Sequence, residues 1–566
     1  MPQSTLTDIQ NAADCQISFS ASGAGGALIF KSDQLSTGGA VLKFEGRGSV
    51  EQGEKVSTFA SEFLSRAQGE RPFQVPGVTA HTAASGEIEA FTTYLNNNRD
   101  LVTVPAGREK QFGKALQNLG AFDGGGAICQ MELASGTQMN KLGADTKLNL
   151  FRSPEFAAQM GRAAPVTYAC GYNDQAAIGS METRKGGSNV SNFMYDPEQG
   201  ALTVIDPSTS GARRADFSDR YTRYGTDTAP GLRDAGDQLN HLVANRENFE
   251  CYLENACDGA ANGKDNSAFY EPLNSFLSDN FGDNLFSRAD SEGNENKADV
   301  EAFTQITDLE KKQFTLNYLS GAIDGLDYLK NNLDALEQAA ETVADTVEID
   351  GQTHTVSHFY NQGEMTALRE TLDQIDTVEL RQNFDARVGE YCNALDQRAA
   401  QAESEAARLD QKIDKRENNL LGRIQNFFDR GRKLDQMKND KAEAEAQAGD
   451  LRNQAGKLRE DRDTLGQARA GRAEREQQAL ALGQGQSPAQ NQGDLRQSAG
   501  VLGQPVAAPA NAAENSPRRN SNGAALHRSA DAGPAQASRK NSVGAAMEKG
   551  KVSQAKEQLK KAGMKM

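Results

Sequence analysis

The chain has 566 residues, a net charge of −17, a hydrophobic share of 37% and a mean hydropathy of −0.66. This length predicts several domains, and the low hydrophobic share predicts that part of the chain is solvated helix or disorder. The acidic balance disfavours nucleic acid as a general partner, and no apolar run is long enough to predict a transmembrane segment. Six scattered cysteines, and five histidines without metal-ligand spacing, predict a cytoplasmic protein without a zinc site.

Residues 1–15 are expected to be disordered, and residues 16–45 predict three strands, ISFSAS, ALIFKS and AVLKFE. A glycine-rich turn, GAGG, separates the first two strands. Because such a turn lets backbone amides approach phosphates, Gly23, Gly25 and Gly26 are candidate ligand-binding residues. Lys43 lies between Leu42 and Phe44 in an apolar run, where an inward-pointing ammonium group needs a partner.

Helices are predicted over residues 50–68, 86–97 and 108–120. The first offers Glu62 and, less well placed, Glu54 as carboxylates for Lys43. The run AICQMEL at 127–133 predicts a buried strand that connects two lobes. Its backbone groups around Met131, Glu132 and Leu133 could bind a planar base, although an ordinary buried strand has the same pattern.

A helix is predicted over 154–170, and a β-hairpin follows in NFMYDPEQGALTVID. Its turn has proline early and glycine last, which is typical of a hairpin turn. The pairing would bring Asn192, at the start of the first strand, beside Asp206, at the end of the second. One amide and one carboxylate suit Mg²⁺, which prefers oxygen ligands and shares them with phosphates and water. Strand capping and turn formation are the structural alternatives.

The region from 229 to 393 is predicted to be mostly helical, with residues 357–364 at the surface. From 394 to 480 the composition predicts two long helices that turn near Gly431 and pack together or bind a partner. Apolar stripes mark this segment at Leu409, Ile413, Leu420, Ile424 and Phe427, and at Leu451, Leu458 and Leu465.

Residues 481–566 are low in complexity and predict a disordered tail that ends in a basic segment. A short repeat, RRNSNGAA and RKNSVGAA, places Ser521 and Ser542 two residues after a basic pair, a pattern that basophilic kinases recognise. The tail is either simply solvated or touches an acidic surface, a lipid headgroup or the acidic body of the chain.

Taken together, the glycine turn, the lysine in AVLKF, the glutamate in ASEFL, the connector MELASG and the hairpin ending in VID resemble the protein-kinase-like fold. They are most similar to its atypical branch, which includes phosphoinositide kinases, actin-fragmin kinase and HipA-like kinases. The resemblance covers residues 15–230, with a possible extension toward 390.

The fold class that this resemblance implies is α+β: a small β-rich N-lobe (16–135) and a helical C-lobe (136–393), followed by the helical hairpin (394–480) and the tail. In that resemblance Lys43 holds ATP phosphates, Glu62 pairs with it, and Asn192 and Asp206 bind Mg²⁺, with Mn²⁺ as an alternative. The family's catalytic aspartate would fall at Gly187, which has no carboxylate. Asp174, in CGYND, is the substitute candidate for the catalytic base.

The function implied is an ATP- and Mg²⁺-dependent phosphotransferase acting on a protein hydroxyl or an inositol lipid. Two alternatives stay open: nucleotidyl (AMP) transfer on the same fold, and an inert pseudokinase that recruits partners. The domain style resembles bacterial effectors delivered into the host cytosol, with a host protein partner on the helical hairpin or tail.

Overall fold

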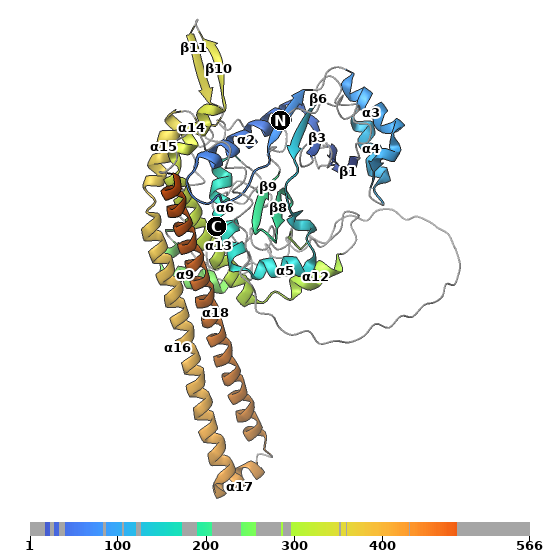
Figure 1. Cartoon of the computed structure of the whole chain (residues 1–566). Helices are drawn as coiled ribbons and strands as arrows, with labels where there is room; N and C mark the ends of the chain where they lie inside the picture. Colours follow the sequence, from blue (N-terminus) through green and yellow to red (C-terminus); the bar gives the residue numbers. More distant parts are fainter. Residues whose placement is uncertain are drawn as a thin grey trace, which may run out of the picture. The chain divides into compact units, whose positions relative to one another are not determined.

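In the computed structural model the chain is α+β: mostly helical, with small, largely antiparallel sheets and a long C-terminal helical region (Figure 1). The structure describes residues 17–22, 28–32, 40–82, 86–104, 107–119, 126–171, 190–205, 239–240, 242–255, 285–286, 296–349, 352–357, 359–360, 362–428 and 431–483. Residues 484–566 of the predicted tail, with Ser521 and Ser542, lie outside these ranges, whereas residues 481–483 belong to the last described helix.

The largest sheet has six strands in the order β4-β6-β3-β2-β1-β5. Neighbouring strands are antiparallel except β1 and β5, which are parallel. The helix α2, Arg47–Arg66, follows β3 directly, and α3, Glu87–Asn97, and α4, Glu109–Leu119, lie between β4 and β6, close to their predicted bounds. The strands are β1 Ile17–Ser22, β2 Leu28–Ser32, β3 Ala40–Gly46, β4 Val78–Thr82, β5 Val102–Thr103 and β6 Gly126–Glu132.

The two faces of this sheet differ. Phe30, Leu42 and Phe44 pack with Phe91 of α3 and Phe112 of α4 in one apolar core. Since side chains alternate along a strand, Lys43 belongs to the opposite face. That face also has Cys129 directly beside Lys43 and Ala80 beside Cys129, and Val50 of α2 packs against Cys129. The N-terminal half of α2 therefore covers the sheet face that bears Lys43.

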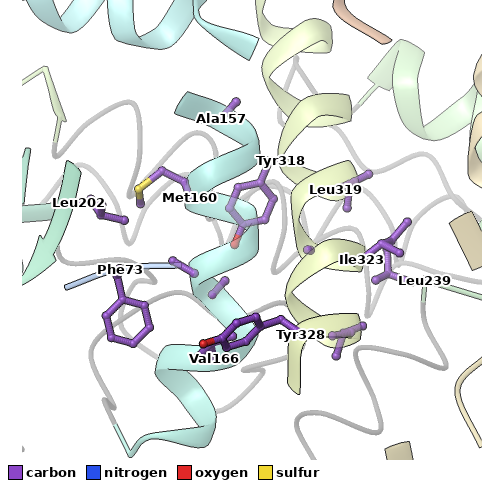
Figure 2. Packing of buried hydrophobic residues seen from close by; sticks show 14 of the residues in the cluster. Phe73, Ala157, Met160, Val166, Leu202, Leu239, Tyr318, Leu319, Ile323 and Tyr328 are labelled. Carbon is purple, nitrogen blue, oxygen red and sulfur yellow. The ribbon is translucent and has the colours of Figure 1, made fainter. Parts of the chain in front are cut away.

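A helical core is built around α6, Pro154–Ala169, and α13, Asp308–Asn331. Figure 2 shows buried side chains on both helices: Tyr318 lies between them, whereas Met160 points toward Leu202 and Ile323 toward Leu239. The two backbones approach so closely that a Cβ atom at Gly161 would lie 1.9 Å from the Tyr318 carbonyl oxygen. Further helices are α5 Ala144–Arg152, α9 Arg246–Asn255, α12 Lys297–Thr304, α14 Leu333–Thr342 and α15 Gln362–Asp373.

Two sequence predictions for the middle of the chain were incomplete. A β-hairpin, β10 Ala344–Ile349 and β11 Gln352–Ser357, interrupts the region that was predicted to be mostly helical. The expected surface position of 357–364 is wrong for Phe359 and Tyr360, which are buried. The Phe359 ring stacks on Phe59 of α2 with centroids 4.2 Å apart, an apolar partner that lies 300 residues away in sequence.

The C-terminal region is a long helical hairpin, α16 Thr377–Asn418 and α18 Arg432–Gly483, with the short α17, Leu420–Phe428, at its end (Figure 1). The chain turns at Gly431, as predicted, where φ is +75°. The first helix begins at 377 instead of 394, because no helix breaker separates the two segments. Among the helices that the structure describes, none combines the length and apolar character needed to cross a membrane.

Candidate functional site

The predicted hairpin is present as β8, Phe193–Asp196, and β9, Ala201–Val204. Its register pairs Phe193 with Val204 and Asp196 with Ala201, and Gly200 closes the turn with a φ of +62°. At the open end, the Asn192 carbonyl accepts a hydrogen bond from the Ile205 amide at 2.9 Å. The backbone of Asn192 therefore lies beside the residue that precedes Asp206, as the sequence predicted. Asp206 itself lies outside the described residues.

The hairpin is joined to the connector that follows β6. A two-residue strand, β7 Thr137–Gln138, pairs with β8 and makes a three-stranded sheet. Gly136, with a φ of +87°, lies so close to this sheet that a Cβ atom there would be 2.4 Å from the Tyr195 carbonyl oxygen. Only glycine fits both constraints, so the connector is held against the hairpin.

The segment between α2 and β4 reaches the other edge of the same hairpin. The Gln74 amide donates to the Leu202 carbonyl at 2.8 Å, and the Val204 amide donates to the Gln74 carbonyl at 3.0 Å. The hairpin thus lies between two segments that come from the six-stranded sheet and from α2.

Asn192 is 7% exposed, and its Nδ2 atom has no hydrogen-bond partner among the residues that the structure describes. It belongs to the short helix η4, Val190–Asn192, which contacts η3, Met139–Lys141. In η3 the Oδ1 atom of Asn140 is also buried without a partner in the described ranges. Because buried amide groups are nearly always hydrogen-bonded, these two unsatisfied atoms on neighbouring turns indicate a place for a polar ligand.

The donor set at this end of the hairpin fits a hard cation. The side chain of Asn192 can present an amide oxygen, since the assignment of O and N in an amide follows from its surroundings, and Asp206 follows Ile205 in the chain. No three Asp, Glu, His or Cys side chains converge within the described ranges. A cation here would therefore depend on Asn192, Asp206 and oxygens of its ligand.

The carboxylates of α2 are arranged differently from the sequence prediction. Glu62 makes an ion pair with Arg66, 2.8 Å away and one turn later, and is 36% exposed. Glu54 lies one turn after Val50, on the side of α2 that packs on the sheet, and its Oε1 accepts from the Ala80 amide at 3.0 Å. Glu54 is therefore an α2 carboxylate beside the row of residues that contains Lys43. Glu54 ranks second from the sequence because strand pairing, which places Ala80 beside it, cannot be read there.

The connector residues are mostly engaged within the protein. Met131 is buried and pairs with Val41 and Val78. The Glu132 amide donates to the Gly77 carbonyl at 2.9 Å, and the Glu132 carboxylate accepts from the Gly77 amide at 3.2 Å. The amide hydrogen of Glu132 is thus already used in the fold, which leaves Leu133, half-buried and next in the chain, as the better candidate for contact with a base.

A cluster of three cations lies near the end of the connector and was missed by the sequence analysis. Burial, and then the positive charges of Lys31 and Arg108, lower the pKa of the Lys141 ammonium group. Lys31 is on β2, Arg108 precedes α4 and Lys141 is in η3, so three distant segments contribute. The mutual repulsion of these cations favours an anion in their neighbourhood.

Several predicted site residues fall outside the described ranges: Gly23, Gly25, Gly26, Asp174 and Asp206. Their assignments stay predictions. No protein-family model matches the chain, and no curated protein is similar enough in sequence to count as a relative.

Proposed function

We propose that this protein is an ATP- and Mg²⁺-dependent phosphotransferase of the kinase-like type, acting on a protein hydroxyl or an inositol lipid. The observation that supports this most directly is the hairpin, whose open end brings Asn192 beside the residue before Asp206. In protein kinases an asparagine and an aspartate hold the metal ions, and a lysine on the third strand pairs with a glutamate of the following helix. Here Lys43 lies on β3, and α2 follows that strand directly.

Each residue has a role in this proposal. Lys43 neutralises phosphate charge, and Glu54 replaces Glu62 as the carboxylate of α2 that orients the lysine. Leu133 and the adjoining backbone contact the base, and Asn192 and Asp206 hold Mg²⁺. The bound cation would withdraw charge from the phosphate oxygens. Asp174 is the proposed base, and the six-stranded sheet and the helical core are the two lobes between which the nucleotide lies.

The test uses full-length protein with ATP labelled at either the α- or the γ-phosphate, incubated with a eukaryotic cell extract and with phosphoinositide vesicles. Transfer of the γ-label only is expected. Transfer of the α-label would instead support nucleotidyl transfer, and no transfer together with no Mg²⁺-dependent ATP binding would refute the proposal. ATP binding without transfer would support the pseudokinase alternative.

Four single-residue variants test the roles assigned to individual residues. Asn192→Ala and Lys43→Met should abolish label transfer, because each removes a group that contacts the metal or the phosphates. Glu54→Gln should reduce transfer far more than Glu62→Gln, since Glu62 has Arg66 as its partner and is partly exposed. The opposite ranking would show that the original assignment of Glu62 is correct.

A further inference from the structure

A second site lies away from the hairpin end, in a cavity of about 350 Å³ between α6, α13 and α18. Five arginines line it: Arg71, Arg162, Arg469, Arg472 and Arg475. Three acidic residues, Glu70, Glu155 and Asp324, line it as well. We call this space the arginine cavity.

Only some of the arginines that line the arginine cavity form ion pairs with carboxylates. Arg475 pairs with Glu70 at 2.7 Å, and Arg472 pairs with Asp324 at 2.8 Å. Asp324 also accepts from Arg381, a neighbour outside the lining, at 2.5 Å. The remaining lining arginines, Arg71, Arg162 and Arg469, have no carboxylate partner among the described residues.

Arg162 is the most unusual of these groups, because it is 8% exposed. Its guanidinium donates to the backbone carbonyl of Glu70 and lies over the Tyr328 ring, 5.4 Å from the centroid. Burial, followed by the charge of Arg472, lowers its pKa. A buried cation without a carboxylate is costly unless an anion accompanies it.

We propose that the arginine cavity binds a compact anion with several phosphate groups, either free or as a lipid headgroup. Guanidinium groups bind phosphate oxygens in pairs, and the excess of two positive charges over the three lining carboxylates suits a multiply charged ligand better than a single carboxylate. The volume lies in the range of small-molecule sites, roughly 300–1,000 Å³, and is too small for a folded segment.

This ligand would connect four parts of the chain. Arg162 is on α6, Arg469 is on α18, and Arg71 follows α2. Gly200, the turn of the β8–β9 hairpin, also lines the cavity, and its carbonyl accepts from Gln159 of α6 at 3.1 Å. An anion here would therefore strengthen the packing of the helical hairpin against the part of the chain that holds the candidate site.

The test is isothermal titration calorimetry of the full-length chain with tripolyphosphate. Arg71 is exposed and Arg469 donates only to Ser320 Oγ, at 3.1 Å, so the double variant Arg71→Gln/Arg469→Gln should fold normally. Binding should weaken about tenfold or more in this variant, since each charged hydrogen bond lost is worth at least that factor. The matched control is Arg452→Gln, an exposed arginine of α18 paired with Glu403, which should bind like wild type.

Lys43→Met separates this site from the proposed phosphotransferase site, because it should remove only the tripolyphosphate binding that the latter contributes and should leave unchanged the binding that Arg71→Gln/Arg469→Gln weakens. Loss of all binding in Lys43→Met, equal binding by the double variant and wild type, or no binding of wild type to either tripolyphosphate or phosphatidylinositol bisphosphate vesicles would each overturn the proposal. Binding to vesicles with phosphatidylinositol bisphosphate but not to tripolyphosphate would assign the cavity to a lipid headgroup, provided that Arg71→Gln/Arg469→Gln loses this binding and Phe427→Ser/Phe428→Ser retains it. Preferential binding of an RKNSVGAA peptide phosphorylated at Ser542 would refute a small-molecule ligand.

A different observation concerns α17, at the end of the helical hairpin. Leu420, Leu421, Phe427 and Phe428 are each more than three-quarters exposed, and Ile424 is 45% exposed. The helix is firmly held, because a Cβ atom at Gly422 would lie 2.6 Å from the backbone of Arg416. We call these five exposed apolar residues the apolar tip.

The surroundings of the apolar tip are basic. Residues 412–438 contain eight lysines or arginines and four aspartates or glutamates. A short helix with phenylalanine and leucine on its exposed surface, flanked by basic residues, is typical of segments that lie in a membrane interface. We infer that the apolar tip inserts into the surface of an anionic lipid bilayer, with the basic residues contacting headgroups.

Vesicle co-sedimentation of the full-length chain tests this inference. Binding should require anionic lipid and should fall at least tenfold in Phe427→Ser/Phe428→Ser, because each phenylalanine contributes about 1.5–3 kcal/mol on leaving water. Val378→Ser is the matched control, since Val378 is 63% exposed but lies at the far end of α16. Vesicle binding unchanged by the tip variant, or a tip variant that converts a dimer to a monomer in sedimentation, would overturn it.

Discussion

Replacing Gly321 by alanine tests the packing on which the helical core depends. A Cβ atom there would lie 1.9 Å from the Ala158 carbonyl oxygen of α6, and ordinary contacts begin near 3.4 Å. The obstructing atom is backbone, so no side chain can rotate away, and α6 and α13 must separate by more than 1 Å. Such overpacking costs roughly 1–3 kcal/mol or more, against a gain of about 1 kcal/mol in helix propensity. We expect a net loss of about 2 kcal/mol.

The measurement is urea unfolding followed by circular dichroism, with Gly456→Ala as the control. Gly456 is an exposed residue of α18 with no atom within 4 Å of an added Cβ, so this variant should gain up to about 1 kcal/mol. Gly161→Ala should resemble Gly321→Ala, and the double variant should cost less than the sum, because one helix displacement relieves both contacts. If Gly321→Ala were as stable as Gly456→Ala, the close approach of α6 and α13 would be refuted.

Three further predictions concern buried ionisable groups. Gln313 and Asn317 donate to Asp461 at 2.8 and 3.0 Å, but burial still raises the pKa of its carboxyl group. The contribution of this group to the free energy of unfolding is therefore fully present below the ordinary aspartate pKa and is lost as pH rises through the raised pKa. Asp461→Asn should therefore stabilise the protein at pH 7 in urea unfolding, with the difference disappearing in acid; a constant difference would contradict this. Lys147 and Asp299 form an ion pair at 2.5 Å with side chains 1% and 3% exposed, so Lys147→Met should cost about 3–5 kcal/mol, and Lys147→Met/Asp299→Leu should recover most of it. Burial raises the thiol pKa of Cys170 and Cys392, so a thiol-reactive dye should label the half-buried Cys251 before either of them, as mass spectrometry can show.

Local patterns predicted the local elements well. The proline and glycine of DPEQG predicted the β8–β9 turn, and the apolar spacing predicted α2, α3, α4 and α6 within a few residues. These features depend on neighbours in the sequence. The backbone pairing of Asn192 with Ile205 was predictable for the same reason, since a hairpin register is fixed by its turn.

Long-range contacts were not predictable in this way. Glu62 and Glu54 look alike in sequence, and only the pairing of β4 with β6 places Ala80 where Glu54 can bind it. The stacking of Phe359 on Phe59 and the approach of Lys141 to Lys31 also join segments that are more than 100 residues apart. The arginine cavity has the same origin, because its cations come from three separate elements.

The apolar stripe of the helical hairpin shows where periodicity stops being informative. Leu409 and Ile413 are buried between α16 and α18, as their spacing predicts, whereas Leu420, Ile424 and Phe427 continue the stripe and are exposed. The difference arises because α16 ends at Asn418 and α17 turns across the end of the pair, so within the described part of the chain no second helix faces its apolar residues. One continuous apolar stripe in the sequence therefore forms two surfaces, of which one is buried and the other is exposed to solvent. The first is buried between the two helices, and the second is the surface that we propose enters a lipid bilayer, which is why the two phenylalanines of the apolar tip are the most informative positions to change.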